Sequence, residues 1–178
     1  IFSEVSLSRP TNRRIANLES LESREVLSPG GPSAEAQYML EIINQARTNP
    51  KAVAERVTTD LDPDVQATLK YYGVDISAAR AEIGSTRVTQ PVAWNDRLAN
   101  AAIVHSMDLA RTGIQSHTGS DGSSPGDRLD RSNYANRTGE AENVYAYSES
   151  VDHAMQAFLI DWGVSGNGHR NNIMQPNA

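Results

Sequence analysis

The segment Val151–Trp162 reads VDHAMQAFLIDW and is the strongest amphipathic stretch of the chain. Its apolar residues recur at the three- and four-residue spacing of one helix face, which predicts a helix that packs a continuous stripe against a broad surface. Methionine and aromatic residues at this spacing ordinarily fill core volume, so we interpret the stripe as core and not as a cofactor-binding face. His153 lies off the stripe, and we predict that it is solvated.

Further helices are predicted on the N-terminal side of this segment. Ser33 is a suitable N-cap for an apolar-periodic helix that runs to Asn49. The following proline interrupts that helix and suits the first position of a second, reoriented helix over residues 50–57. Weaker patterns indicate short helices over residues 64–72 and 77–82. The N-terminal half of the domain is therefore expected to be helical.

A longer helix is predicted from Asn95 to the stop signal at Gly113. His105 falls on its apolar stripe, and we interpret it as a hydrogen-bonded core residue and not as a ligand. Ser124 followed by proline predicts the cap of another helix. The segment 143–147 is short and rich in β-favouring residues, so we predict a strand there.

Composition limits the classes of function. The chain has 178 residues, 38% of them hydrophobic, which suffices for one domain with a core. Its net charge of −6 argues against a nucleic-acid partner. There is no cysteine, so disulfides and thiolate chemistry play no part. No run of about 18 to 20 apolar residues is present, so we predict no transmembrane segment.

The first 33 residues differ in character from the rest. Residues 1–33 are polar and end in a cluster of Ser, Pro and Gly at 28–33, which we interpret as a tail and linker. Within it, residues 18–28 resemble a segment found near the N-terminus of some exported bacterial surface proteins. We expect one domain over residues 34–178.

Three short polar islands combine an imidazole or a carboxylate with small residues: Ser116–Gly119, Ala141–Asn143 and Gly168–Arg170. Each follows an apolar segment, where a side chain can leave the core and face a cleft. Two neutral imidazoles held close together can share a divalent metal, with a carboxylate or water completing the shell. The two histidines are far apart in sequence, so only the fold can bring them together. The islands therefore predict one His/Glu/His site.

Six ordered motifs carry a family resemblance across about residues 34–176. The motifs are LEIINQAR (40–47), PVAWNDRL (91–98), HSMD (105–108), SHTG (116–119), AENV (141–144) and GHRNNI (168–173). In this order they resemble the CAP superfamily, the cysteine-rich secretory, antigen and pathogenesis-related group. The chain is similar to a bacterial, cysteine-free member of it.

The resemblance implies an α+β fold: an α-β-α sandwich with an antiparallel sheet between helical layers and a cleft lined by two histidines and two acids. Carried over by motif, the cleft residues are His117, Glu142 and His169. Asp161 is a fourth candidate, at a place where related sequences carry Glu. A metal, Zn²⁺ or another divalent cation, is expected on His117 and His169. Ala141 replaces the usual Gly of the family motif, which puts the turn before Glu142 in question.

The family continues into further strands beyond the last motif, whereas this sequence stops at Ala178. We therefore expect the terminal strands to be missing from this chain, as in a C-terminally truncated product. An incomplete sheet would leave residues 143–147 as an unpaired edge.

The resemblance implies a secreted or cell-surface binding domain whose cleft takes a divalent metal, a small apolar or lipid-like ligand, or both. An alternative is a peptidase- or esterase-like hydrolase in which His117 or His169 acts as general base and Glu142 orients it. Ser116 and Ser120 lie nearby in sequence, but neither stands in a Gly-x-Ser-x-Gly elbow, so we favour binding over catalysis. A third alternative is a purely structural polar cluster without a ligand.

Overall fold

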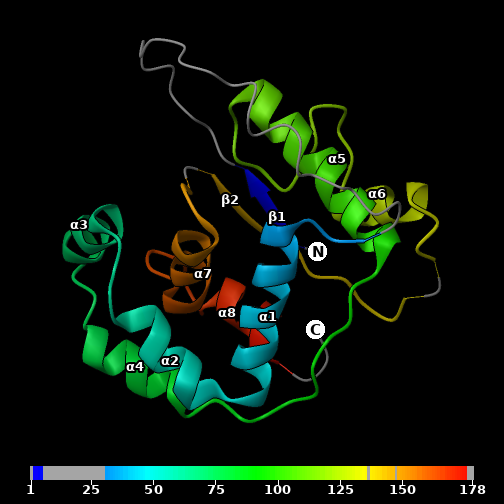
Figure 1. Cartoon of the computed structure of the whole chain (residues 1–178). Helices are drawn as coiled ribbons and strands as arrows, with labels where there is room; N and C mark the ends of the chain where they lie inside the picture. Colours follow the sequence, from blue (N-terminus) through cyan, green and yellow to red (C-terminus); the bar gives the residue numbers. More distant parts are fainter. Residues whose placement is uncertain (1, 6–30, 136, 147, 176–178) are drawn as a thin grey trace, which may run out of the picture.

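A computed structural model describes residues 2–5, 31–135, 137–146 and 148–175. Most of the described chain is helical (Figure 1). The helices are α1 (Ala34–Thr48), α2 (Pro50–Thr58), α3 (Pro63–Tyr72), α4 (Ile76–Gly84), α5 (Asp96–Thr112), α6 (Pro125–Arg131), α7 (Val151–Ile160) and α8 (Gly168–Met174), and the strands are β1 (Phe2–Val5) and β2 (Asn143–Ala146). The predicted segment at 18–28 lies outside the described residues.

The junction of α1 and α2 has the local cause that the sequence indicates. Ser33 Oγ accepts a hydrogen bond from the amide of Ala36 and begins α1. Asn49 Oδ1 accepts one from the amide of Ala52, with Pro50 at the first position of α2. The proline has no amide hydrogen to continue α1, so the chain turns and starts again. The two predicted helices are confirmed.

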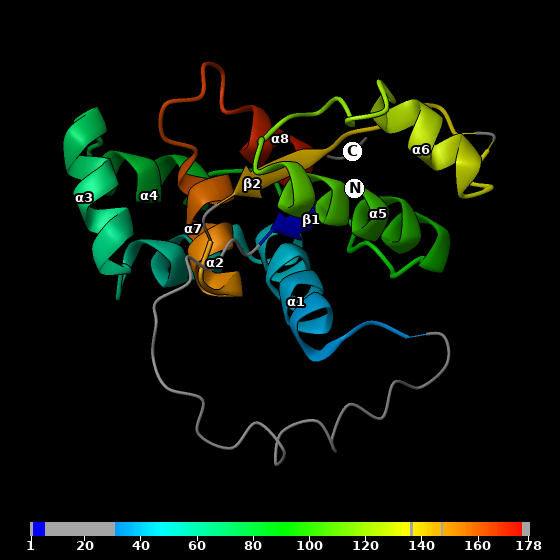
Figure 2. The ribbon, with the colours of Figure 1, turned by 90° about the horizontal axis from the view of Figure 1, so that it is seen from above.

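Helix α7 lies at the centre of the main hydrophobic core. Met155, Phe158 and Leu159 are almost fully buried and belong to one cluster with residues of α1, α2, α4 and α8. Helix α7 contacts α1, α2 and β2, and Figure 2 shows it next to β2. A helix that is apolar on most of its circumference is buried on all sides. The interpretation of this segment as core is confirmed.

Two details of α7 differ from the sequence-based prediction. The helix ends at Ile160, because Asp161 adopts the left-handed conformation with φ of 60° and closes it. His153 is buried, at 5% exposed, so the prediction that it is solvated is wrong. Tyr145 of β2 covers it and places its hydroxyl 3.2 Å from His153 Nε2. A periodicity that shows one packed face does not reveal a strand packed on the other.

The strand region departs from the implied antiparallel sheet. Within the described residues the sheet has two strands, β1 and β2, which run parallel with Phe2 opposite Asn143. The whole of the intervening chain connects them, as parallel pairing requires a long crossover. The predicted strand is confirmed from Asn143 to Ala146, but it is not left as an unpaired edge on the side where β1 lies.

Helices cover both faces of this two-stranded ladder. Helix α5 contacts β1, whereas α7 contacts β2. Figures 1 and 2 show α5 and α6 on one side and α1, α2, α4 and α7 on the other. The described residues thus form a mostly helical domain with one ladder of two parallel strands.

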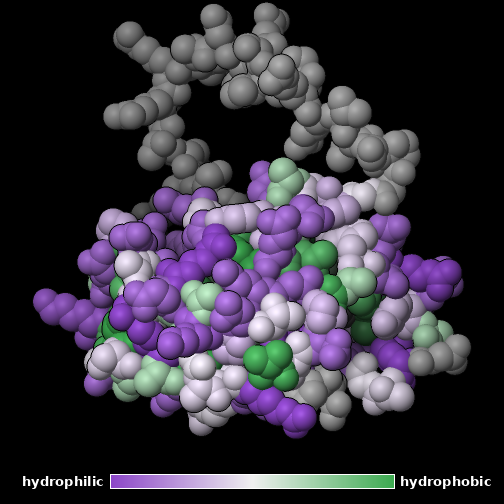
Figure 3. All heavy atoms as spheres, turned by 60° about the horizontal axis from the view of Figure 1, so that its bottom comes forward, coloured by the Kyte–Doolittle hydropathy of each residue, from purple (hydrophilic) through white to green (hydrophobic). Residues whose placement is uncertain are grey.

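The surface seen in Figure 3 is mostly hydrophilic, with apolar residues scattered among the polar ones. Scattered apolar residues of this kind are ordinary on folded domains. Among the described residues, none of the helices combines the length and the apolar character needed to cross a bilayer.

Candidate functional site

The first part of the candidate site joins a surface histidine to a buried acid. His117 Nδ1 lies 2.9 Å from Glu142 Oε1. The Glu142 side chain is only 2% exposed, whereas that of His117 is 58% exposed. A carboxylate oxygen accepts, so the hydrogen lies on His117 Nδ1 and the lone pair remains on Nε2. The buried acid therefore fixes which imidazole nitrogen is available for a ligand.

Arg128 compensates the buried charge of Glu142. Its Nη2 lies 2.6 Å from Glu142 Oε2, and both side chains are almost completely buried. The same guanidinium donates to the carbonyl oxygens of Ser123 and His117. Arg128 thereby ties the backbone of the His117 loop to the acid that orients the His117 ring. A buried carboxylate with a guanidinium partner and good geometry can remain ionised.

Local structure explains how Arg128 reaches this position. Ser124 and Asp127 form a reciprocal capping box that begins α6, as the sequence predicts. One turn of helix then directs Arg128 inward. Arg128 is not among the site residues predicted from the sequence, since an arginine in a short polar helix ordinarily faces solvent. The one sequence feature that could have indicated its burial is its position one turn after the strong N-cap at Ser124.

His105 approaches the same acid from α5. It is 1% exposed, and its Nε2 lies 2.9 Å from the carbonyl oxygen of Ser116 and 3.8 Å from Glu142 Oε1. The interpretation of His105 as a hydrogen-bonded core residue is confirmed. Its bond to Ser116 also fixes the start of the loop that carries His117, so this core residue supports the site.

The second part of the site is an analogous histidine–acid pair. His169 Nδ1 lies 2.7 Å from Asp161 Oδ1, and the Asp161 side chain is fully buried. The other oxygen of Asp161 accepts from the amide of Arg170 at 3.1 Å. The His169 ring packs beside Phe158, with 5.3 Å between ring centroids. The left-handed turn at Asp161 that ends α7 points its carboxylate at the start of α8.

Consecutive residues at the start of β2 connect the two pairs. Glu142 binds the His117 ring, and Asn143 Nδ2 donates to the carbonyl oxygen of His169 at 3.0 Å. Asn172 Nδ2 donates to Asn143 Oδ1 at 2.8 Å and secures α8 to the same strand. The structure thus places all four candidate residues in two pairs attached to one strand end. Within the described residues, no hydrogen bond or ring contact joins the two imidazoles directly.

Ala141 fits the turn that precedes Glu142. It is absent from the described residues with positive φ, so its backbone lies in a region open to any L-residue. Replacement of the usual Gly therefore causes no backbone strain here.

The donor set has a definite chemical character. Each imidazole bonds a carboxylate through Nδ1, an arrangement that orients metal-binding histidines in many proteins. The Nδ1 atoms of both rings are already bonded to these acids. Among the described residues, no group of three or more His, Cys, Asp or Glu is placed to hold a metal ion. Each pair thus leaves the Nε2 atom of one imidazole as a lone-pair donor.

Neither serine near His117 is prepared as a nucleophile. Ser116 Oγ accepts from the amide of Thr118, and Ser120 Oγ bonds Asp108 and Arg111. A serine nucleophile requires a hydrogen bond to its base. Within the described residues neither hydroxyl bonds to an imidazole.

Comparison with known families gives one match. The model of the family described as CAP: Cysteine-rich secretory protein family matches residues 40–178. Neither the curated proteins nor the solved structures yielded a match to this chain. The family match spans both histidine–acid pairs and α5 to α8.

Proposed function

The chain belongs to the CAP, or cysteine-rich secretory protein, family, and from this premise we propose that it is a binding domain whose two carboxylate-oriented histidines hold a divalent cation. The observation that supports the proposal is the repeated contact of Nδ1 with a buried acid, at His117–Glu142 and His169–Asp161. Such pairing leaves Nε2 of each ring as a lone-pair donor.

Two imidazoles are fewer than the three or four protein ligands of ordinary zinc sites. The remaining positions on the ion are then free for water or for an external ligand. When bound, the ion would act as a Lewis acid that attracts an anionic or carbonyl oxygen of that ligand. The two acids keep both imidazoles in the tautomer with hydrogen on Nδ1. Glu142 and Asn143, at the start of β2, hold the His117 ring and the His169 carbonyl oxygen.

The family supports a secreted or cell-surface location, which belongs to the same proposal. A hydrolase is less favoured, because neither Ser116 nor Ser120 bonds a histidine. A stabilising role of the Glu142–Arg128 cluster has direct support in its burial and is compatible with cation binding.

The test is calorimetric titration of the full chain with Zn²⁺. We expect saturable binding near neutral pH that weakens in acid, because imidazole ligates only in its neutral form. The double variant His117→Ala/His169→Ala should lose the binding heat. The matched control is Glu140→Gln, which alters an exposed acid paired with Arg137 and should bind like the parent. Equal heats for the parent and the double variant would refute cation binding at these histidines.

A further inference from the structure

Arg170 follows His169 in the sequence, and its side chain is only 9% exposed. Its guanidinium donates from Nε to the carbonyl oxygen of Leu159 at 2.7 Å and from Nη2 to that of Ile160 at 3.0 Å. Its third nitrogen, Nη1, bonds Glu82 of α4 at 3.0 Å. Two of the three guanidinium nitrogens therefore bind the end of α7.

The end of α7 has carbonyl oxygens that need such a donor. Leu159 and Ile160 are among its last four residues, whose carbonyl oxygens have no partner within a helix. The next residue, Asp161, is left-handed with φ of 60° and ψ of 43°. This conformation is uncommon for a residue with a Cβ and persists only where the surroundings determine it. The Arg170 guanidinium fixes the two peptide groups that lead into this turn.

The backbone of Arg170 contacts the Asp161 carboxylate itself. The Arg170 amide donates to Asp161 Oδ2 at 3.1 Å, which leaves Oδ1 to accept from His169 Nδ1 at 2.7 Å. The Asp161 side chain is fully buried, and among the described residues His169 is its one ion-pair partner. The direction of the carboxylate therefore depends on the turn at Asp161, and this turn depends on Arg170.

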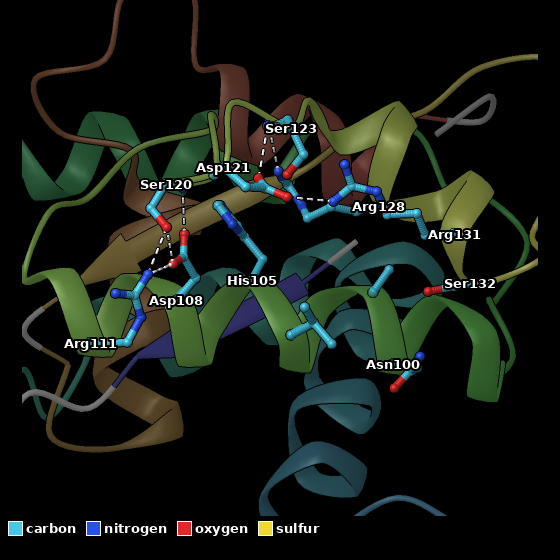
Figure 4. Close-up of a pocket in the computed structure, with 13 residues that line it drawn as sticks. Asn100, His105, Asp108, Arg111, Ser120, Asp121, Ser123, Arg128, Arg131 and Ser132 are labelled. Carbon is cyan, nitrogen blue, oxygen red and sulfur yellow. Dashed lines mark hydrogen bonds and ion pairs between the residues drawn. The ribbon is translucent and has the colours of Figure 1, made fainter.

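The other histidine–acid pair is supported in a different way. Arg128 bonds the carboxylate of Glu142 directly at 2.6 Å. Figure 4 shows Arg128 on α6 directed toward Ser123, whose carbonyl oxygen it also binds at 2.9 Å. The Arg170 guanidinium, by contrast, reaches its pair through the carbonyl groups before the acid. Each pair thus has a buried arginine, one acting on the acid and the other on the backbone.

From these contacts we propose that Arg170 is the positioning residue of His169. Its guanidinium holds the left-handed turn at Asp161, and the turn aims the carboxylate at His169 Nδ1. The ring therefore keeps its hydrogen on Nδ1 and its lone pair on Nε2. The consequence for cation binding rests on the proposed function, whereas the consequence for the tautomer does not.

The test is long-range ¹H–¹⁵N NMR of the imidazole rings in the full chain carrying Arg170→Gln, recorded without metal. The substitution keeps the backbone amide, so it removes only the guanidinium contacts. We expect the ratio of Nδ1-protonated to Nε2-protonated His169 to fall about tenfold, as expected when the hydrogen bonds that hold the carboxylate are weakened. His117 should keep its ratio in the same spectra.

A milder variant provides the same measurement if Arg170→Gln does not fold. Arg170→Lys keeps the charge but presents its donors from a single nitrogen, so it cannot reproduce the two-carbonyl contact. We expect its His169 ratio to fall in the same direction by a smaller factor.

The matched control is Arg47→Gln. Arg47 is 4% exposed, and it donates to the carbonyl oxygens of Ile173 and Gln175 at the end of α8. This variant removes a comparably buried guanidinium from a helix end, so it should also destabilise the fold. It should leave the His169 ratio unchanged, because it does not touch the turn at Asp161.

Zinc titration of the same variants separates this proposal from the proposed function. With zinc binding in the parent, Arg170→Gln should bind about tenfold more weakly or worse, and Arg47→Gln should bind like the parent. Without zinc binding in the parent, the cation site is refuted and the tautomer ratio alone decides the role of Arg170. An unchanged His169 ratio in the folded Arg170 variants, or an equal change in Arg47→Gln, would overturn the proposal.

Discussion

Glu142 and Arg128 form a salt bridge of 2.6 Å between side chains that are 2% and 4% exposed. The pair connects the residue just before β2 with α6, and both of its members bond to His117. A surface imidazole is thus held by a charge pair that solvent scarcely reaches. Energetically, removal of one partner leaves the other charge buried without compensation.

Substitution of Glu142 by Ala should therefore be strongly destabilising. We expect a loss of about 3 to 5 kcal/mol in the free energy of unfolding, the usual cost of an uncompensated buried charge. Denaturant titration measures it. Glu140→Ala, which breaks a partly exposed pair with Arg137, should cost about 1 kcal/mol or less. Equal effects of the two variants would show that the buried pair is energetically unimportant.

A double-mutant cycle should reveal coupling between the two charged residues. Glu142→Leu and Arg128→Met each leave one buried charge without its partner, whereas the double variant removes both charges. We expect the double variant to be more stable than the sum of the single losses implies, by about 1 to 3 kcal/mol. Additive losses would contradict a direct interaction.

Truncation in the core should confirm the central place of α7. Met155 is fully buried, so Met155→Ala should cost about 2 to 5 kcal/mol through lost burial and a residual cavity. Met107 is 67% exposed on α5, and Met107→Ala should change stability by about 0.5 kcal/mol or less. Thermal or chemical unfolding of the two variants provides the comparison, and a mild effect at Met155 would place the core elsewhere.

Acid should weaken the attachment of the Ser120 loop to α5. The pKa of Asp108 is lowered from 3.8 to about 2, first by the Ser120 hydroxyl and then by the Ser120 amide and Arg111. A depressed folded-state pKa contributes stability above the ordinary value and loses it as pH falls through the folded value. Asp108→Asn should therefore flatten the dependence of unfolding free energy on pH between about 4 and 2. An unchanged pH profile would show that Asp108 is not protected in the fold.

The elements predicted correctly are those with a local cause. The caps at Ser33, Asn49 and Ser124 and the stripe of α7 each depend on residues a few positions apart. Hydrogen bonding at a helix end and burial of one helix face can be predicted from residues a few positions apart. Those parts of the fold follow from the sequence.

The parts that the sequence did not reveal depend on distant contacts. The pairing of Phe2–Val5 with β2 joins segments that lie far apart in the sequence, and each strand has four residues, too few to produce a pattern. Burial of His153 results from Tyr145 on a neighbouring strand, and burial of Arg128 from a carboxylate on another element. For the candidate site, the motifs nominate the histidines and acids, but only the fold assigns which acid bonds which ring.

The proposed cation site requires that His117 and His169 each donate through Nδ1 to an acid and keep Nε2 for a cation. Long-range ¹H–¹⁵N NMR of the imidazole rings, recorded near neutral pH with and without Zn²⁺, tests it most directly. We predict that His117 and His169 are both protonated on Nδ1 and that added zinc shifts Nε2 of both rings. Protonation on Nε2, or zinc-induced shifts confined to other histidines, would contradict it.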